Sequence, residues 1–340
     1  MDFVEINGGH GEGGGQIIRS ATTLSCITKK PVHIVNIRKY RKVSGLKPQH
    51  ITAIKILQKI SNAEVIGNYI GSTELKFIPK DIKSQKLNED VGTAGSISLI
   101  LQTIIPLAVV LKEKLQVKIR GGTDVLWSPT INYSEKILKE VFRRMGLKFS
   151  LKITKRGYFP KGEGEVELEV FSSKVNSISL SKRTSNDISI LCTYSKIPLE
   201  LISKEIEKIE SKINENFTVD IEIKEEKAID SGSSLLAYSI DEKTIFGIDS
   251  LFDKKNKKFD FDVEKFLENS SAIDENLADM LVLPASLASG KTTFEVKEMT
   301  SHLETNLFVT SKITGCRYGI GKLPKGYQVI IEGISYSSIK

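Results

Sequence analysis

Cysteine is scarce in this chain, and long apolar runs and a basic leader are missing. The three cysteines, Cys26, Cys192 and Cys316, form no C-x-x-C pair, so they cannot all pair and cannot build a zinc site by themselves. The most apolar run, residues 97–111, contains Ser, Gln and Thr, whereas a membrane helix needs about 18 apolar residues. The start, MDFVEINGG, lacks the regions of a signal peptide. These absences predict a reduced, cytoplasmic protein with no membrane partner.

The composition is that of a globular protein. A content of 40% hydrophobic and 27% charged residues, with 9 Pro and 25 Gly, excludes disordered and collagen-like chains. A length of 340 residues is enough for roughly two domains. The 49 Lys and Arg against 42 Asp and Glu give a net charge of +7. This charge suits an anionic partner such as nucleic acid or a nucleotide, although a solvated Lys-rich surface is the plainer explanation.

One pattern occurs three times along the chain: a helix, a short Lys-containing connection, a strand, an amphipathic helix and two more strands. Its first helices are expected at 15–28, 95–111 and 276–288, and the strands after them at 32–37, 115–122 and 292–299. Its second helices are expected at 48–60, 133–145 and 303–313. With an opening strand such as FVEIN, each copy would be a βαβαββ unit.

Residues 181–270 interrupt this pattern before the third copy. The segment is rich in Lys and Glu, its order of strands and helices differs, and its helix has an apolar stripe of isoleucines at helical spacing. We therefore predict an α/β (α+β) protein. Its large domain would comprise 1–180 and 271–340, and a smaller α+β domain, 181–270, would be inserted between them.

A glycine-rich loop, GHGEGG, spans Gly9 to Gly14 between a predicted strand and a predicted helix. It matches the dinucleotide fingerprint, but the next strand ends at Ile37 and Arg38 without the acidic residue that binds a ribose. A tight turn is a second interpretation. The glycine density favours a third, a loop whose backbone N–H groups bind an anion. Within it, Glu12 is a candidate ligand of a divalent cation, or else a solvated turn residue.

The stretch ASLASGKT resembles a P-loop, but here the helix precedes the loop and a strand follows, which is the reverse of P-loop order. We expect Gly290 in it to cap the end of a helix instead.

His302 is the sharpest catalytic candidate. Ser301 and Glu304 have capping-box spacing, which predicts Ser301 as N-cap and His302 as the first helical residue. The positive end of a helix disfavours imidazolium, so a neutral, nucleophilic imidazole is expected there, and the same end attracts an anion. A solvated histidine is the plainer interpretation. His10, His33 and His50 have no comparable setting.

Arg19, Arg38, Arg41 and Gln49 come from the first predicted helix, the end of the following strand and the loop after it. Folded as one unit, they would converge beside the glycine loop as phosphate ligands. Each alone is more typical of a surface residue.

Together these stretches are similar to a known family. GHGEGGGQIIRSATTLS, IRKYRKVSGLKPQH, GTAGSISLILQT, GGTD, RGYFPKGEGEVELEV, NLADMLVLPASL and TSHLETNLFV resemble, in this order, the RNA 3'-terminal phosphate cyclases. The resemblance implies a large domain of three βαβαββ units and an inserted domain of thioredoxin-like topology. It is weaker across the insert.

The resemblance also implies a three-step reaction. His302 would attack the α-phosphate of ATP, giving histidyl-AMP and pyrophosphate. AMP would pass to the 3'-phosphate of an RNA, and the neighbouring 2'-OH would then expel AMP and form a 2',3'-cyclic phosphate. Mg²⁺ or Mn²⁺ would assist. The sequence leaves a homodimer open.

Site residues carry over from the family motifs one by one. Glu12 would bind the metal, Arg19 the ATP phosphates, and Arg38, Arg41 and Gln49 the RNA terminus. The nucleotide would be lined by Gln102, Pro129, Asn276, Leu277, Ala278, Asp279 and Met280. The family stretch reads Tyr-Leu-Ala-Asp-Gln, so Asn276 and Met280 replace an aromatic and an amide.

Three other classes compete with this hypothesis. A non-catalytic, cyclase-like RNA-binding protein of ribosome assembly would lack the nucleophile, and the presence of His302 counts against it. A nucleotide-dependent oxidoreductase would rest on the glycine loop alone. A purely structural scaffold predicts that His302→Ala alters nothing but stability.

Overall fold

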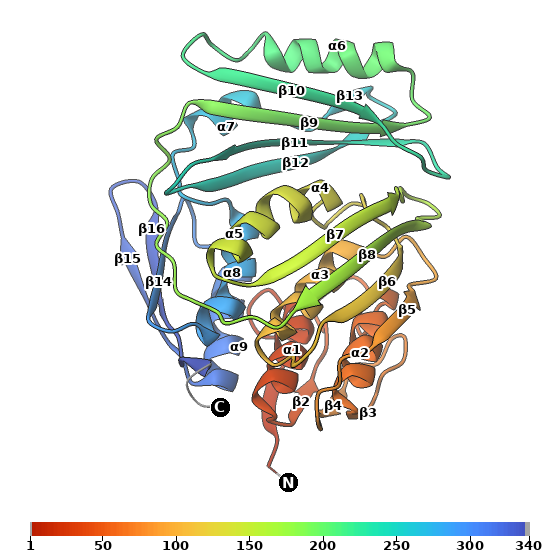
Figure 1. Cartoon of the computed structure of the whole chain (residues 1–340), viewed down its shortest axis with the longest axis vertical. Coiled ribbons are helices and arrows are strands. Elements are labelled where there is room, and N and C mark those ends of the chain that lie inside the picture. Colours follow the sequence, from red (N-terminus) through yellow and green to blue (C-terminus); the bar gives the residue numbers. More distant parts are fainter. Residues whose placement is uncertain (1, 337–340) are drawn as a thin grey trace.

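The computed structural model describes residues 2–336, which form a mixed α/β molecule with several sheets (Figure 1). The first sheet has the order β1-β2-β4-β3, in which β1 and β2 are parallel and the other pairs antiparallel. Its strands are β1 (Val4–Asn7), β2 (Val32–Val35), β3 (Glu64–Ile66) and β4 (Leu75–Ile78). Helices α1 (Gly15–Thr28) and α2 (Pro48–Ser61) belong to the same stretch and start where the sequence predicted.

The second sheet has the matching order β5-β6-β8-β7, again with its first pair parallel. Its strands are β5 (Lys86–Asp90), β6 (Leu115–Gly121), β7 (Lys148–Lys155) and β8 (Gly164–Phe171). The helix expected over 95–111 is shorter: α3 (Ile97–Ile104) gives way to a 3₁₀ turn, η1 (Ile105–Val109). Pro106 lies in that turn and has no N–H with which to continue the α-helical bonding.

The next helix is a continuous run of α4 (Ile131–Tyr133), a π-helical turn η2 (Ser134–Leu138) and α5 (Lys139–Arg144). It begins two residues before the predicted start. The side chain of Thr130 accepts a hydrogen bond from the Tyr133 N–H and so caps the helix there.

A third sheet, β14-β16-β15, is antiparallel. It comprises β14 (Lys291–Val296), β15 (Arg317–Lys322) and β16 (Tyr327–Glu332), with helices α8 (Glu275–Leu287) and α9 (Ser301–Thr314). Residues 176–179 run parallel to residues 289–293 through two isolated bridges, the second of which reaches β14. The prediction of Gly290 as a helix cap is wrong, because α8 ends at Leu287 and Ala288, the residue after it, already has an extended backbone.

The fourth sheet has five strands in the order β10-β9-β11-β12-β13 and lies at the end of the molecule opposite both termini (Figure 1). Its elements are β9 (Asp187–Ser195), α6 (Leu199–Glu210), β10 (Thr218–Glu225), β11 (Gly232–Ile240), β12 (Ile245–Asp253), β13 (Lys258–Phe259) and α7 (Val263–Glu268). It has a hydrophobic core of its own, in which the predicted stripe residues Ile202, Ile206 and Ile209 are buried.

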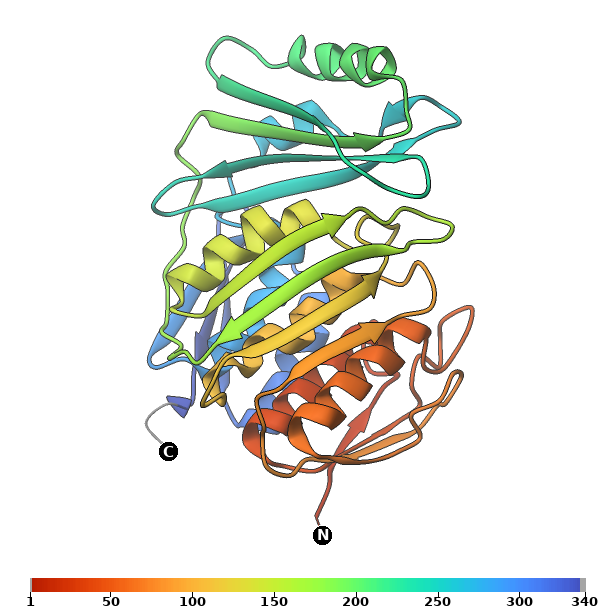
Figure 2. The same cartoon turned by 45° about the vertical axis from the view of Figure 1, so that its right-hand side comes forward.

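The other sheets surround a central layer of helices in which α1 contacts α2, α3 and α9, and α8 contacts α9 (Figure 2). The three cysteines are buried and unbridged. None of the helices within residues 2–336 combines the length and apolar character needed to cross a membrane.

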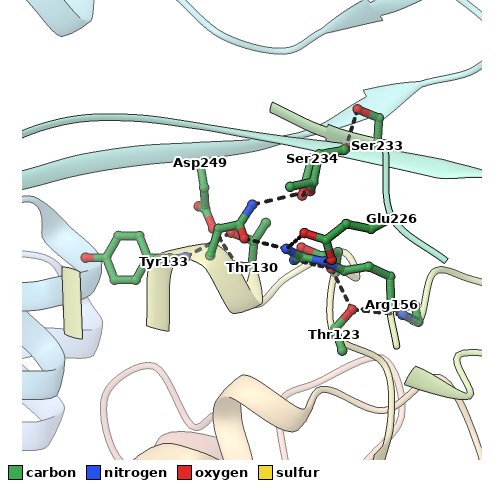
Figure 3. A network of polar contacts seen from close by, with 12 residues as sticks. Thr123, Thr130, Tyr133, Arg156, Glu226, Ser233, Ser234 and Asp249 are labelled. Carbon is green, nitrogen blue, oxygen red and sulfur yellow. Dashed lines mark hydrogen bonds and ion pairs between the residues drawn. The ribbon is translucent and has the colours of Figure 1, made fainter. Parts of the chain in front are cut away.

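A buried polar cluster joins the five-stranded sheet to the rest (Figure 3). Arg156, 1% exposed, donates from Nε and Nη2 to the Glu226 carboxylate at 2.6 and 2.9 Å, and from Nη2 to Asn132 Oδ1 at 2.7 Å. Its Nη1 donates to Asp124 Oδ2 at 3.3 Å. We call these four residues the Arg156 cluster.

Asp249 and Asp274 extend this junction. Asp249 of β12 accepts a hydrogen bond from the Thr130 N–H at 2.5 Å. Asp274 caps α8 and accepts from the Leu277 N–H at 3.0 Å, from the Tyr133 hydroxyl at 2.7 Å and from the Gly247 N–H at 3.2 Å. The start of α8 is thus tied both to α4 and to β12.

Candidate active site

The glycine loop between β1 and α1 lies against α9. Gly11 and Gly13 have φ of +54° and +62°, a conformation that glycine adopts without strain. A Cβ on Gly11 would lie 2.2 Å from Thr305 Oγ1, so only glycine permits this approach. The Glu12 N–H donates to the same hydroxyl at 3.1 Å. α1 starts after Gly14 without a side-chain cap, which leaves N–H groups at its positive end for an anion.

His302 lies in the first turn of α9, beside this loop. The prediction of Ser301 as N-cap is wrong by one residue: Thr300 caps the helix, and its hydroxyl accepts from the Leu303 N–H at 3.1 Å. The His302 side chain is half exposed, and its Nε2 lies 3.5 Å from Glu12 Oε1. Burial lowers the pKa of His302, and the positive charges of Arg19 and Arg41 lower it further. The imidazole is therefore neutral at pH 7 and has a nitrogen lone pair available for attack.

Glu12 connects His302 to Arg41, with which it forms an ion pair. Its side chain is only 11% exposed. Within the described chain no cluster of three or more His, Cys, Asp or Glu side chains is arranged to hold a metal ion. A single carboxylate nevertheless fits Mg²⁺ bound together with substrate phosphates, because that ion keeps several water and phosphate ligands.

A small pocket, about 20 Å³ in volume, opens between α1, α3, α8 and α9. Its lining comprises Gln16, Arg19, Ser20, Gln102, Pro106, Phe142, Asp279, Met280, Leu283 and Asn306. Arg19 Nε and Asp279 Oδ1 are buried in it without a hydrogen-bond partner. We call this the Arg19 pocket. Four of the predicted nucleotide residues, Arg19, Gln102, Asp279 and Met280, meet there.

Burial is the largest influence on the pKa values of Asp279 and Arg19, the two charged groups in the pocket. It raises the pKa of Asp279 to about 7, although Arg19 opposes the shift. It lowers the pKa of Arg19 to about 10, although Asp279 opposes the shift. Buried polar atoms of this kind are normally paired, so the unpaired ones are suited to a polar ligand.

Arg38 lies on the segment between β2 and α2, and Gln49 is the second residue of α2. Arg38 has φ +56°, its Nε is buried without a partner, and burial lowers its pKa. Gln49 Oε1 accepts from the Ser96 N–H at 2.9 Å. This bond links Gln49 to the start of α3 and leaves its amide NH₂ as a donor for a further acceptor.

His50 is a member of this site that the sequence reasoning missed. Its Nδ1 accepts from the Lys47 N–H at 3.1 Å, so the proton of the neutral ring is on Nε2. That Nε2 would lie 2.3 Å from a Cβ on Gly15, which places the ring against the start of α1. Burial, followed by the charges of Arg19, Arg38 and Lys47, lowers its pKa to about 3. Its place after Gln49 in the PQH stretch was the available signal.

The remaining predicted residues lie elsewhere. Asn276 is exposed in the first turn of α8, whereas Leu277 and Ala278 are buried in the core. Successive residues of a helix point in different directions, so only part of this stretch reaches the pocket. Pro129 is buried beside the capping residue Thr130 and is not part of the pocket lining.

The model of one protein family, described as RNA 3'-terminal phosphate cyclase, matches residues 10–320. Curated relatives with that name include proteins of Sulfolobus acidocaldarius, 37% identical with 91% of this chain and 94% of the relative covered, and of Saccharolobus islandicus, 35% identical with 95% and 98% covered. A third, from Pyrobaculum aerophilum, is 32% identical with 98% and 99% covered. The match spans the segment between β8 and α8 as well as both ends.

Proposed function

The chain belongs to the RNA 3'-terminal phosphate cyclase family, and on that premise we propose that it converts RNA 3'-phosphate ends into 2',3'-cyclic phosphates with ATP as co-substrate. The observation that carries the proposal is the neutral His302 at the start of α9, beside Glu12, Arg41 and the uncapped start of α1. A nucleophile in such a setting is suited to attack on a bound phosphate.

We propose three steps, two nucleotidyl transfers followed by a cyclisation that releases AMP, which make the enzyme a ligase. A ring nitrogen of His302 bonds to the α-phosphorus of ATP, and the bond to the bridging oxygen breaks, releasing pyrophosphate. An oxygen of the RNA 3'-phosphate then takes the AMP as the P–N bond breaks. The 2'-OH finally loses its proton and attacks the 3'-phosphorus, and AMP departs with the electrons of the broken P–O bond.

The positions of the side chains support a division of roles. Arg19 would bind the ATP phosphates, and Gln102, Asp279 and Met280 the nucleoside, since all four line one pocket. Arg38, Arg41 and Gln49 would hold the RNA 3'-phosphate. Glu12 would hold Mg²⁺ or Mn²⁺, which would neutralise charge on the phosphates. The assignments of Pro129, Asn276, Leu277 and Ala278 have only the family motif in their support.

We also propose the domain division 1–180, 181–270 and 271–340, of which 337–340 lie outside the described residues, and three βαβαββ units. The identical strand orders of the first two sheets and the separate core of the fourth support it. The thioredoxin-like topology of the insert, the cytoplasmic location and the homodimer remain predictions.

The decisive experiment is incubation of the purified protein with ATP labelled at the α-phosphate, with Mg²⁺ or Mn²⁺ and without RNA, followed by a denaturing gel. We expect an acid-labile adduct with wild type and none with His302→Ala. Because His302 is half exposed, the variant should unfold at nearly the same denaturant concentration. No adduct from folded wild-type protein would refute the enzymatic proposal and favour a non-catalytic RNA-binding relative.

A further inference from the structure

Large hydrophobic side chains are exposed mainly on one set of loops. Twelve large hydrophobic side chains are exposed among the described residues, and seven of them lie on four loops. These loops connect β2 to α2, β3 to β4, β6 to α4, and β7 to β8. The seven side chains are Tyr40, Val43, Tyr69, Ile70, Leu126, Trp127 and Phe159. Scattered apolar residues on a surface need no explanation, but a concentration on neighbouring loops indicates a binding surface.

These loops are joined to one another and to Gln49. The Gly71 N–H donates a hydrogen bond to the Leu46 carbonyl, which joins the first two loops. Gln49 binds the Ser96 N–H, and the adjacent Gly95 O accepts from the Gly122 N–H at 2.9 Å. The Thr123 N–H then donates to Gly157 O at 2.9 Å, at the base of the loop that carries Phe159. Figure 2 shows the loops after β2, β5, β6 and β7 on the same side of the molecule.

Positive charges outnumber negative ones on these loops. They carry Arg38, Lys39, Arg41, Lys42 and Lys161, and all but the half-buried Arg38 are exposed. Of the three acidic residues there, Asp124 is buried against Arg156, Glu163 pairs with Arg120, and Glu74 lies 2.6 Å from His33 Nε2. A surface with aromatic rings among exposed cations suits single-stranded nucleic acid, whose bases stack on the rings while its phosphates meet the cations.

Trp127 is the most prominent of the rings. It is the only tryptophan of the chain, it is 96% exposed, and its φ of +62° is unusual for a bulky side chain. The next residue, Ser128, donates to the Val125 carbonyl at 3.0 Å and so fixes the turn. Phe159, 72% exposed, stands on the adjacent loop.

We propose that Trp127 and Phe159 form a stacking platform for the nucleotides that precede the 3'-phosphate of the RNA. The strand would run from Arg38 and Gln49, which hold the terminal phosphate, across residues 92–95 to the two rings. The proposal rests on the proposed function for the place of the 3'-phosphate. It adds a subsite that selects for single-stranded RNA of some length, without reading its sequence.

The lone tryptophan makes a direct test possible. RNA of about ten nucleotides with a 3'-phosphate should quench the fluorescence of the wild-type protein. The same RNA with abasic sites upstream of its terminal nucleotide should quench far less, because it retains phosphates but not bases. A nucleoside 3',5'-bisphosphate, too short to reach the platform, should not quench at all. Equal quenching by normal and abasic RNA would overturn the proposal.

Substitutions of the two rings test how much each contributes to RNA affinity. Trp127→Ala should weaken binding of labelled RNA roughly 10- to 100-fold, the range expected for loss of base stacking, and Trp127→Phe should restore most of it. Phe159→Ala should have a smaller effect in the same direction. Tyr318→Ala removes an exposed ring on β15, far along the chain from these loops, and should leave RNA affinity unchanged. Equal RNA affinity of Trp127→Ala and wild type would refute the platform.

The adenylylation assay without RNA separates the two proposals. A protein that forms the adduct but shows no base-dependent quenching would refute the platform and leave the cyclase proposal intact. A protein that shows quenching but forms no adduct would refute the cyclase proposal alone. If Trp127→Ala instead lowers adduct formation without RNA, the ring contacts the nucleotide of ATP, and the platform for RNA is wrong.

Discussion

Arg156 is buried and Arg19 is partly buried, and their surroundings differ. Arg156 donates from Nε, Nη1 and Nη2 to protein acceptors, whereas Arg19 Nε has no partner. Burial taken alone lowers the pKa of both guanidinium groups, but the net shifts differ. At Arg156, Asp124 and Glu226 outweigh burial and the net shift is upward, whereas at Arg19 the pKa falls to about 10 in spite of Asp279.

The comparison distinguishes a structural use of buried charge from a functional one. Breaking a satisfied buried network leaves its partners unpaired, which is costly to stability. Unpaired polar atoms in a pocket are costly in the free protein, and the cost is relieved when a ligand pairs them. The Arg156 cluster therefore holds the five-stranded sheet to the rest, and the Arg19 pocket is suited to a charged substrate.

The largest expected effect comes from Arg156→Met. Removing the cation leaves Asp124 and Glu226 without their partner and should lower the free energy of unfolding by about 3–5 kcal/mol. Urea denaturation measures this. Arg143→Met removes an exposed arginine paired with Glu140 and should leave the unfolding midpoint nearly unchanged. Similar midpoints for the two variants would show that the Arg156 cluster does not hold the sheets together.

The same substitution in the pocket, Arg19→Met, should act on binding instead. Loss of charge-assisted contacts to phosphate should weaken ATP affinity roughly 10- to 100-fold, measured by calorimetry. The loss of stability should be far smaller than for Arg156→Met, because Arg19 has one hydrogen bond to lose, to Gln16, and its Nε has no partner. A large loss of stability with unchanged ATP affinity would reverse the assignment of the two regions.

Asp249 makes the junction sensitive to pH. Burial raises its pKa to about 6 although the Thr130 N–H opposes the shift. Between the ordinary aspartate pKa near 4 and about 6, the native state binds a proton that the unfolded state has lost. The contribution of Asp249 to the free energy of unfolding is therefore greatest below about pH 4. It falls as the pH rises to about 6 and is constant above that. Urea unfolding of wild type and Asp249→Asn from pH 4 to 8 should show a shallower fall in the variant, and parallel curves would contradict this.

The smallest expected effect is a shift in the pH dependence of the adduct-formation rate, on its acidic side. Arg41 is one of the charges that lower the pKa of His302, so Arg41→Gln should raise that pKa. The pH below which the adenylylation rate falls should then move upward, since protonated imidazole cannot attack. Lys42→Gln removes a neighbouring exposed cation and is the matched control. An identical midpoint for Arg41→Gln and wild type would show that Arg41 does not tune the nucleophile.

Much of the fold was predictable because its determinants are local. The helix α1 has the predicted bounds, and α2 starts at the predicted proline, since apolar period and end residues act within a few turns. The errors were local as well. Thr300 rather than Ser301 caps α9, a choice between adjacent hydroxyls that spacing does not resolve, and Pro106 ends α3 early.

The sequence by itself determined the periodic elements, the glycine loop and the family to which the chain belongs. Only the tertiary structure decided which residues meet: Glu12 contacts Thr305 across 293 positions, His50 packs against Gly15, and Asp279 but not Asn276 enters the Arg19 pocket. The physical reason is that burial, unpaired atoms and shifted pKa values arise when distant segments exclude water from one another, and no local pattern records that.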